Sequence, residues 1–263
     1  MGKITLSIFI FLISLQSMMI ENSSASPNTA RDQTAAARDH YWRAIGQSEK
    51  DVIAPLISPD FNGGPNWPSA HQAYRIIRRN NTTIFATDGM SDPYDLASKE
   101  GNGFGMELFI EVPNESLSKM SEVGQIPQHW AFLLLKNTAQ LVAKAGGIIP
   151  SLNQYGVLSV EFPNAKAASE FTLQVPDRFF ADDGAIGVLI GGPAPDFSTD
   201  IPNMPLSAVK AVPVVLVSAK ELSIIRQQGA SARKGLAQKL TAAGYHSVSD
   251  LNRKDMSVDS SAF

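Results

Sequence analysis

The chain has 263 residues, of which 44% are hydrophobic and 18% charged, a composition typical of a globular protein and too apolar for a disordered one. Its net charge of −3 argues against a nucleic-acid partner, because domains that bind nucleic acids usually carry a basic excess. The absence of cysteine excludes disulfides, thiolate metal sites and a cysteine nucleophile.

The N-terminus has the pattern of a secretory signal peptide. Lys3 supplies a positive charge, residues 4–15 form a short apolar run, and small residues precede and include Ala25. A membrane-spanning helix needs ~20 apolar residues, so this run favours a cleaved signal over the alternative, an uncleaved anchor. We therefore expect residues 1–25 to be a signal peptide cleaved near Ala25, and the mature protein to be periplasmic or secreted without stable insertion in a membrane. Export without cysteine favours a bacterial envelope protein.

The segment over residues 26–70 is expected to contain one helix and one long loop. Residues 26–31 are interpreted as flexible, and residues 32–57 as a helix, because Tyr41, Ile45 and Val52 recur near helical spacing. The following residues to position 71 are dense in proline and glycine, which is typical of an irregular loop.

Three strands are predicted next. Residues 74–77 and 82–86 form a predicted hairpin, and residues 106–112 alternate strictly between two faces. One face carries Met106, Leu108, Ile110 and Val112. The other carries Glu107, Phe109 and Glu111, and we interpret its two glutamates as facing solvent.

The second half mixes helices and strands without regular alternation. A helix is predicted from Pro127 to the glycines at 146 and 147, because Trp130, Leu134 and Leu141 share one face. Further predictions are strands at 157–162, 171–175, 185–190 and 212–217, a proline-rich irregular run before residue 206, and helices at 219–228 and 231–243. Residues 246–263 are predicted to form a C-terminal tail, polar and loose from residue 254. The helix at 219 opens on a capping box of Ser218 and Glu221. This pattern predicts an α+β fold, with helices packed on a mixed β-sheet.

No motif for catalysis or for binding a metal or cofactor stands out. The four histidines, His40, His71, His129 and His246, lack the spacing of a metal site, and neither a serine-hydrolase motif nor a phosphate-binding loop is present. Glu107 and Glu111 lie four residues apart on a strand, or ~13 Å, which is too far for a retaining glycosidase pair. We therefore expect no catalytic residue, no cofactor and no metal.

Two glycine-rich turns and the strand after them resemble the signature of the suppressor of fused domain. The residues that carry this resemblance are Gly89, Ser91, Asp92, Tyr94, Gly103, Phe104, Gly105 and Glu107. Met106 departs from the family pattern, which has an aromatic residue there. The resemblance covers residues 71–245 and implies a mixed α/β domain that binds a protein. In animals the family sequesters a transcription factor, and related bacterial domains are presumed immunity proteins that neutralise toxins. The signature residues are interpreted as structural, because glycines permit tight turns and an aspartate can cap its own turn.

The leading hypothesis is an exported, non-enzymatic domain that binds a protein, namely an immunity protein that neutralises a toxin by direct binding. The candidate contact residues are Phe61, Trp67, Arg226, Arg233 and Lys234. The alternatives are a secreted or periplasmic hydrolase whose site is assembled by the fold from Glu107, Asp92 and His71, and an envelope scaffold or chaperone.

Overall fold

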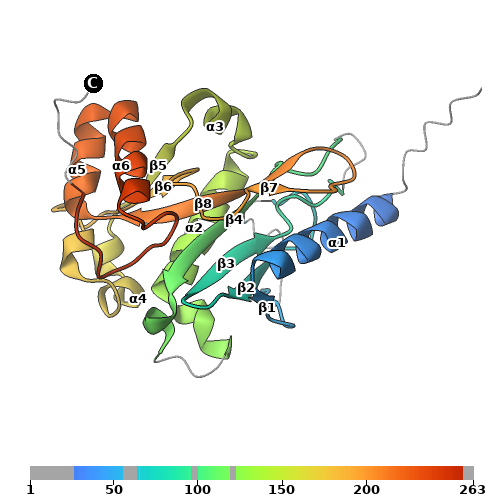
Figure 1. Ribbon diagram of the computed structural model, residues 1–263, viewed down its shortest axis with the longest axis horizontal. Helices are drawn as coiled ribbons and strands as arrows, with labels where there is room; N and C mark the ends of the chain where they lie inside the picture. Colours follow the sequence, from blue (N-terminus) through green and yellow to red (C-terminus); the bar gives the residue numbers. More distant parts are fainter. Residues whose placement is uncertain (1–26, 56–63, 65, 96–99, 119–122, 257–263) are drawn as a thin grey trace, which may run out of the picture.

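The computed structural model describes residues 27–55, 64, 66–95, 100–118 and 123–256. Within these residues the chain forms one mixed sheet of eight strands with helices on both faces (Figure 1). The strands lie across the sheet in the order β1-β2-β3-β4-β8-β6-β5, and β7 pairs with β8 beside this row. The fold is therefore α+β, as predicted. The signal-peptide prediction falls on residues 1–25, outside the described residues.

The first half of the sheet is antiparallel. β2 (Ala73–Arg78) and β3 (Thr82–Asp88) form the predicted hairpin, in which Ile77 lies opposite Ile84. β3 also pairs with β4 (Met106–Pro113), and the short β1 (Gln47–Ser48) pairs with the outer edge of β2. β2, β3 and β4 are each longer than their predicted ranges, whereas β1 lies within the segment predicted as a helix.

β4 lies in the middle of the sheet, where it pairs in parallel with β8 (Val209–Val217). Its predicted alternation is confirmed: the four aliphatic positions pack in the largest core cluster, and Phe109 packs in a separate cluster on the other face. The prediction that Glu107 and Glu111 face solvent is wrong, since they are 0% and 1% exposed. The first helix and the C-terminal segment cover that face. The alternation therefore distinguished the two faces of the strand but did not show that both are buried.

α1 (Pro27–Ile45) differs from its prediction at both ends. It already includes residues 27–31, which were interpreted as flexible, and it ends twelve residues before position 57. Gly46 follows the helix where a Cβ atom would lie 2.5 Å from the carbonyl oxygen of Arg78, and the chain then joins β2 as a strand. Val52, assigned to the helix, is 41% exposed instead.

α2 (Trp130–Lys144) begins three residues later than predicted. Pro127 belongs to the 3-10 helix η3 (Val123–Gln128), which follows η2 (Asn114–Leu117), and His129 caps α2. Trp130 and Leu134 are buried as expected, whereas Leu141 is 39% exposed.

Residues 148–206 depart most from prediction. The predicted strand over residues 171–175 is wrong: α4 (Ser169–Thr172) occupies this position, with Phe171 and Val175 buried one helical turn apart and Leu173 exposed. The other elements are α3 (Ile149–Tyr155), β5 (Leu158–Phe162), η4 (Ala165–Ala167), η5 (Asp177–Phe179), β6 (Ile186–Ile190) and β7 (Asp200–Ile201). Strands β5 and β6 confirm two predictions. α3 and β7 were missed, and β7 lies within the run interpreted as irregular.

The C-terminal elements follow the prediction closely. α5 (Ala219–Gln228) opens on the predicted capping box, in which Ser218 and Glu221 bond each other's backbone N–H groups. α6 (Ala230–Ala242) follows after Gly229. The predicted tail is the exception, because its first part, up to Met256, returns to the sheet. There the N–H of Ser249 donates to the carbonyl oxygen of Glu111, and the buried Arg253 pairs with Glu221.

The helices form layers on both faces of the sheet. α2 packs on one face in the largest cluster, together with residues of α4 and η5. On the other face, α1 covers β2, β3 and β4 through Tyr41 and Trp42, and α5 and α6 cover β6 and β8 through residues such as Leu222 and Leu236. Figure 1 shows α1 and the α5–α6 pair at opposite ends of that face. None of the described helices combines the length and apolar character that crossing a membrane requires.

Candidate functional site

A buried arginine of α1 holds the signature turns together. The guanidinium of Arg38, 1% exposed, lies 2.8 Å from Asp88 and 2.5 Å from Asp92, and it donates to the hydroxyl of Ser91. Its Nε atom also lies 3.7 Å from Glu107. Burial of a guanidinium disfavours its charge, but Glu107, Asp88 and Asp92 outweigh that effect and raise the pKa of Arg38.

Glu107 is surrounded by hydrogen-bond donors from the first signature turn. Its carboxylate accepts from the hydroxyls of Thr87 and Ser91, both at 2.6 Å, and from the backbone N–H groups of Gly89, Met90 and Ser91. Burial raises the pKa of Glu107, while Arg38 and the two hydroxyls favour its ionised form. The carboxylate therefore serves as the anchor of the turn, with its oxygens committed to protein donors.

The remaining signature residues shape the same turns. Gly103 has φ +50°, and a Cβ atom there would lie 2.5 Å from the carbonyl oxygen of Met90. Gly105 and Gly89 also have positive φ, and the ring of Phe104 packs edge-on against Tyr94. Asp92 accepts from Ser69 as well as Arg38. Within this structure the signature therefore forms a turn-and-strand scaffold.

His71 lies at the edge of this network. Its Nε2 atom is 3.7 Å from Asp88, and its side chain is 46% exposed. The nearby carboxylate of Asp88 raises the pKa of His71. Burial alone raises the pKa of Asp88, but His71, Arg38 and Arg75 together bring it below its ordinary value. The fold thus brings together all three residues named for a hydrolase, His71, Asp92 and Glu107, although Asp92 and Glu107 are buried.

Sequence reasoning missed Arg38, which completes this cluster. A signal for it was present: Thr34, Arg38 and Trp42 are spaced four apart and form one buried stripe of α1. A single arginine in such a stripe needs buried carboxylates as partners.

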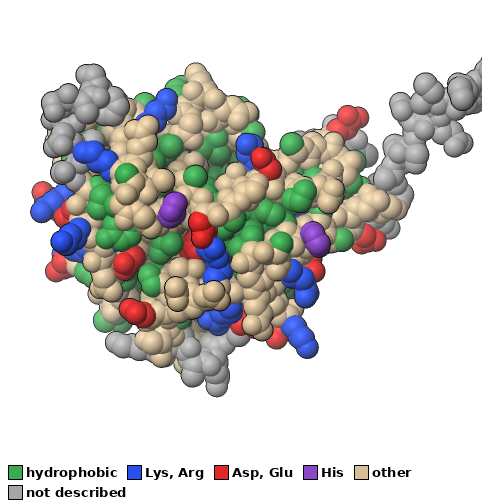
Figure 2. Space-filling model, in the orientation of Figure 1, with side chains coloured by type: hydrophobic (Ala, Val, Ile, Leu, Met, Phe, Trp, Pro, Cys, Tyr) green, Lys and Arg blue, Asp and Glu red, His purple; other side chains and the backbone are tan. Residues whose placement is uncertain are grey.

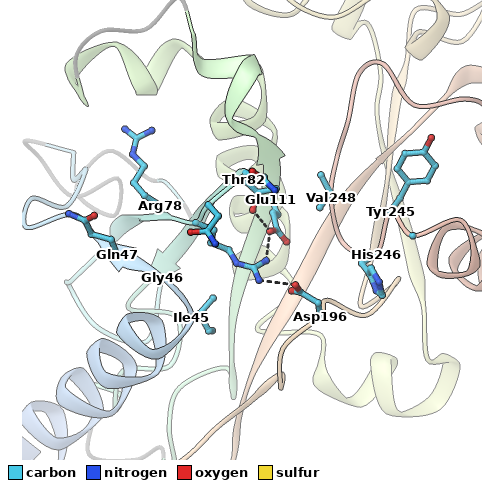
Figure 3. A pocket seen from close by; sticks show the side chains of 14 residues that line it. Ile45, Gly46, Gln47, Arg78, Thr82, Glu111, Asp196, Tyr245, His246 and Val248 are labelled. Atoms are coloured by element: carbon cyan, nitrogen blue, oxygen red, sulfur yellow. Dashed lines mark hydrogen bonds and ion pairs between the residues drawn. The ribbon is translucent and has the colours of Figure 1, made fainter.

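A separate groove lies between α1 and the segment that follows α6. This groove of about 610 Å³ is lined by the end of α1, the β2–β3 hairpin, Glu111 of β4, Asp196 and the segment after α6. Figure 3 shows Glu111 and Asp196 between Gln47 and Arg78 on one side and Tyr245, His246 and Val248 on the other. The tertiary structure alone brings these segments together.

Glu111 and Arg79 form the base of the groove. Glu111 accepts from Arg79 and Thr82, both at 2.6 Å, and from the hydroxyl of Ser247 at 3.0 Å. Arg79 also bonds Asp196 at 2.8 Å. The bond to Asp196 is the main reason that the pKa of Arg79 is raised, and the same bond lowers the pKa of Asp196. The floor of the groove is therefore held by bonds to the β2–β3 hairpin, to Asp196 and to the segment after α6.

The rim of the groove carries exposed amide side chains and an arginine. Gln47, Asn80 and Asn81 are exposed, and Arg78 is half-buried in an ion pair with Glu49 at 3.1 Å. In the space-filling view, basic and acidic side chains lie close together between α1 and the α5–α6 pair (Figure 2). Amide and guanidinium donors arranged in this way can recognise carboxylate and backbone groups of another protein.

Of the predicted partner-contact residues that the structure describes, Trp67 lies in the core and the other three lie on α5 and α6. Phe61 is outside the described residues, and the ring of Trp67 is buried against Tyr74, which places it in the core rather than on the surface. Arg226 bonds Glu161 and Asp183, Arg233 donates to the carbonyl oxygen of Val157, and Lys234 is exposed.

No group of three or more histidine or acidic side chains that could hold a metal ion occurs in the part of the chain that the structure describes.

Comparison with known proteins identifies one family. The family model described as Suppressor of fused protein (SUFU) matches residues 69–254, well over half of the chain. The matched range includes both signature turns, the β2–β3 hairpin and Arg253, while α1 with Arg38 lies before it. The search of curated proteins and the search of solved structures each found no match.

Proposed function

The chain belongs to the suppressor of fused family, whose domains are generally protein-interaction domains, and we propose that this member binds a protein partner in the groove between α1 and the segment after α6. It does so without catalysing a reaction.

The observation that carries this proposal is the construction of the groove. Its floor is held in place by the bonds of Glu111 with Arg79, Thr82 and Ser247, while the rim of Gln47 and the hairpin stays open to solvent. A site that is already ordered loses less entropy on binding, so fewer contacts are needed for tight association.

The buried signature network supports a non-enzymatic role. Glu107 is 0% exposed and accepts five hydrogen bonds from the turn, and Asp92 is held by Arg38 and Ser69. A general acid or base must reach the proton that it transfers, and these carboxylates face protein donors instead.

The partner that we propose is a toxin acting in the cell envelope, which would make this chain an immunity protein. The N-terminal pattern of a signal peptide supports export to that compartment. Inhibitors of this type cover ~800 Å² of the partner, so contacts would extend from the groove onto its rim.

The test compares two matched arginines. The side chains of Arg78 on the rim and Arg226 on α5 are 37% and 36% exposed, and each pairs with a glutamate, Arg226 with Asp183 as well. The partner to be tested is a secreted toxin, sought among the products of the genes beside this one, and calorimetry measures its affinity. We expect Arg78→Glu to weaken binding about tenfold or more and Arg226→Glu to change it about twofold at most.

Two results would contradict the proposal. A larger loss for Arg226→Glu would place the interface on the C-terminal helices α5 and α6 instead. Absence of any partner, together with a hydrolytic activity that is lost in Glu107→Gln, would replace the binding function with the hydrolase alternative.

A further inference from the structure

Strand β5 forms an open edge of the sheet. It pairs with β6 on one side, and no described strand lies on its other side. All five of its residues are partly exposed. Exposed edges in native proteins are usually protected by charged side chains, prolines or bulges. β5, with the sequence LSVEF, pairs with β6 in unbroken register and contains no lysine or proline, and its one charged residue, Glu161, is paired with Arg226 of its own chain. The opposite edge, β1, is only two residues long.

The side chains of β5 are complementary to a second copy of the same strand. Leu158, Val160 and Phe162 pack toward the core on the α2 face, while Ser159 and Glu161 alternate with them. In an antiparallel pair centred on Val160, this residue meets its own copy, Leu158 meets Phe162, and Ser159 meets Glu161. Every apolar residue then lies opposite an apolar one, on the same face of the extended sheet.

An apolar groove of about 360 Å³ runs along this edge. Leu141, Tyr155, Leu158 and Val160 are among the residues that line it. Leu141 and Tyr155 are 39% and 44% exposed, and they are two of the five large hydrophobic side chains that are exposed in the described part of the chain. Apolar surface of this kind beside an unpaired strand is typical of an interface.

Charges along the edge also favour an antiparallel copy. At the start of β5, Arg233 bonds the carbonyl oxygen of Val157 and Lys234 lies beside Gly156. Toward its end, Glu161 and Asp183 share the single cation Arg226, which leaves a net negative charge. Antiparallel pairing brings the positive end of each strand to the negative end of the other.

We propose that β5 pairs antiparallel with β5 of a second copy of this chain, across a two-fold axis at Val160, and so joins the two sheets into one. This isologous contact satisfies the outer backbone groups of both strands. It shares no residue with the groove between α1 and the segment after α6, so each copy keeps that groove free.

The first test uses opposite charges at one position. Sedimentation of the purified chain over a range of concentrations measures the dimer dissociation constant. In the proposed register Ser159 faces Glu161 of the other copy twice per dimer. Ser159→Glu is therefore expected to raise the dissociation constant roughly tenfold, and Ser159→Lys to leave it unchanged or lower it. Equal effects of the two substitutions, or a wild-type chain that stays monomeric at ~100 μM, would overturn the proposal.

A second test does not depend on those substitutions. Because the chain has no cysteine, Val160→Cys introduces a single thiol, which meets its own copy at the two-fold axis. Oxidation is expected to yield a covalent dimer rapidly. The control is Leu173→Cys, a site 85% exposed and away from β5, which should crosslink only by random collision. Crosslinking of Val160→Cys no faster than that control would exclude this register.

Discussion

We predict that His129 makes the folded protein sensitive to mild acid. The residue is 1% exposed and precedes α2, where its Nδ1 atom accepts from the N–H of Ala131 at 3.2 Å. Its ring packs between Phe85 and Trp130, with centroid distances of 5.7 and 5.5 Å. The Nδ1 atom can accept this bond only in the neutral ring, with the proton on Nε2, which lies 3.4 Å from the carbonyl oxygen of Ser116.

The magnitude follows from the difference in pKa between the folded and unfolded chain. Burial lowers the pKa of His129 to about 4, whereas the ordinary value is about 6.5. Between these values the unfolded chain binds a proton that the folded chain does not, so stability is retained above pH 6.5 and falls as the pH drops toward 4. Each pH unit costs about 1.4 kcal/mol, and the whole interval about 3 kcal/mol.

The assay is urea denaturation of the wild type and His129→Asn at several pH values from 7 to 4.5. Asparagine keeps a good N-cap but does not titrate, and every other titrating group is shared by the two proteins. The free energy of unfolding of the wild type should therefore fall relative to that of the variant, by about 2 kcal/mol at pH 5. A difference between the two proteins that stays constant across this range would refute the reasoning, because His129 would then titrate alike in both states.

Three further substitutions test other parts of the fold by the same denaturation assay at pH 7. Arg38→Met should lower the free energy of unfolding by about 3–5 kcal/mol, because it leaves buried carboxylates without their cation. The control Arg43→Met removes an exposed ion pair and should lower it by at most about 0.5 kcal/mol. Arg253→Met should cost a similar ~3–5 kcal/mol, and adding Glu221→Gln should recover part of it if the stranded charge is the cause. Gly103→Ala should cost about 2 kcal/mol or more, and a near-neutral result would contradict the close approach at φ +50°.

Prediction succeeded for the helices and strands whose local sequence pattern is compatible with only one type of secondary structure. The uninterrupted apolar run in β8 indicated an interior strand, and the capping box of Ser218 and Glu221 indicated the start of α5. The two signature turns indicated the family. Prediction failed where a pattern fits two structures: Phe171 and Val175 are compatible with alternation in a strand, but also with one turn of a helix.

The candidate site was less predictable than the fold. The groove is lined by residues from position 45 to position 248, which no local pattern connects. In the sequence, Arg79 and Glu111 each have the pattern of ordinary surface charges. Their hydrogen bonds depend on how the β2–β3 hairpin packs beside β4 and the segment after α6.

The sequence by itself determined the α+β class, the family, and the two alternating faces of β4. Only the tertiary structure decided that both faces of β4 are buried, because covering a face depends on where distant segments pack. Arg38 comes from α1 to pair with the signature carboxylates, and Ser247 comes from beyond α6 to bond Glu111. A glutamate on a strand has the same local pattern whether it meets water or a buried cation, and only the residues that the fold places opposite it distinguish the two.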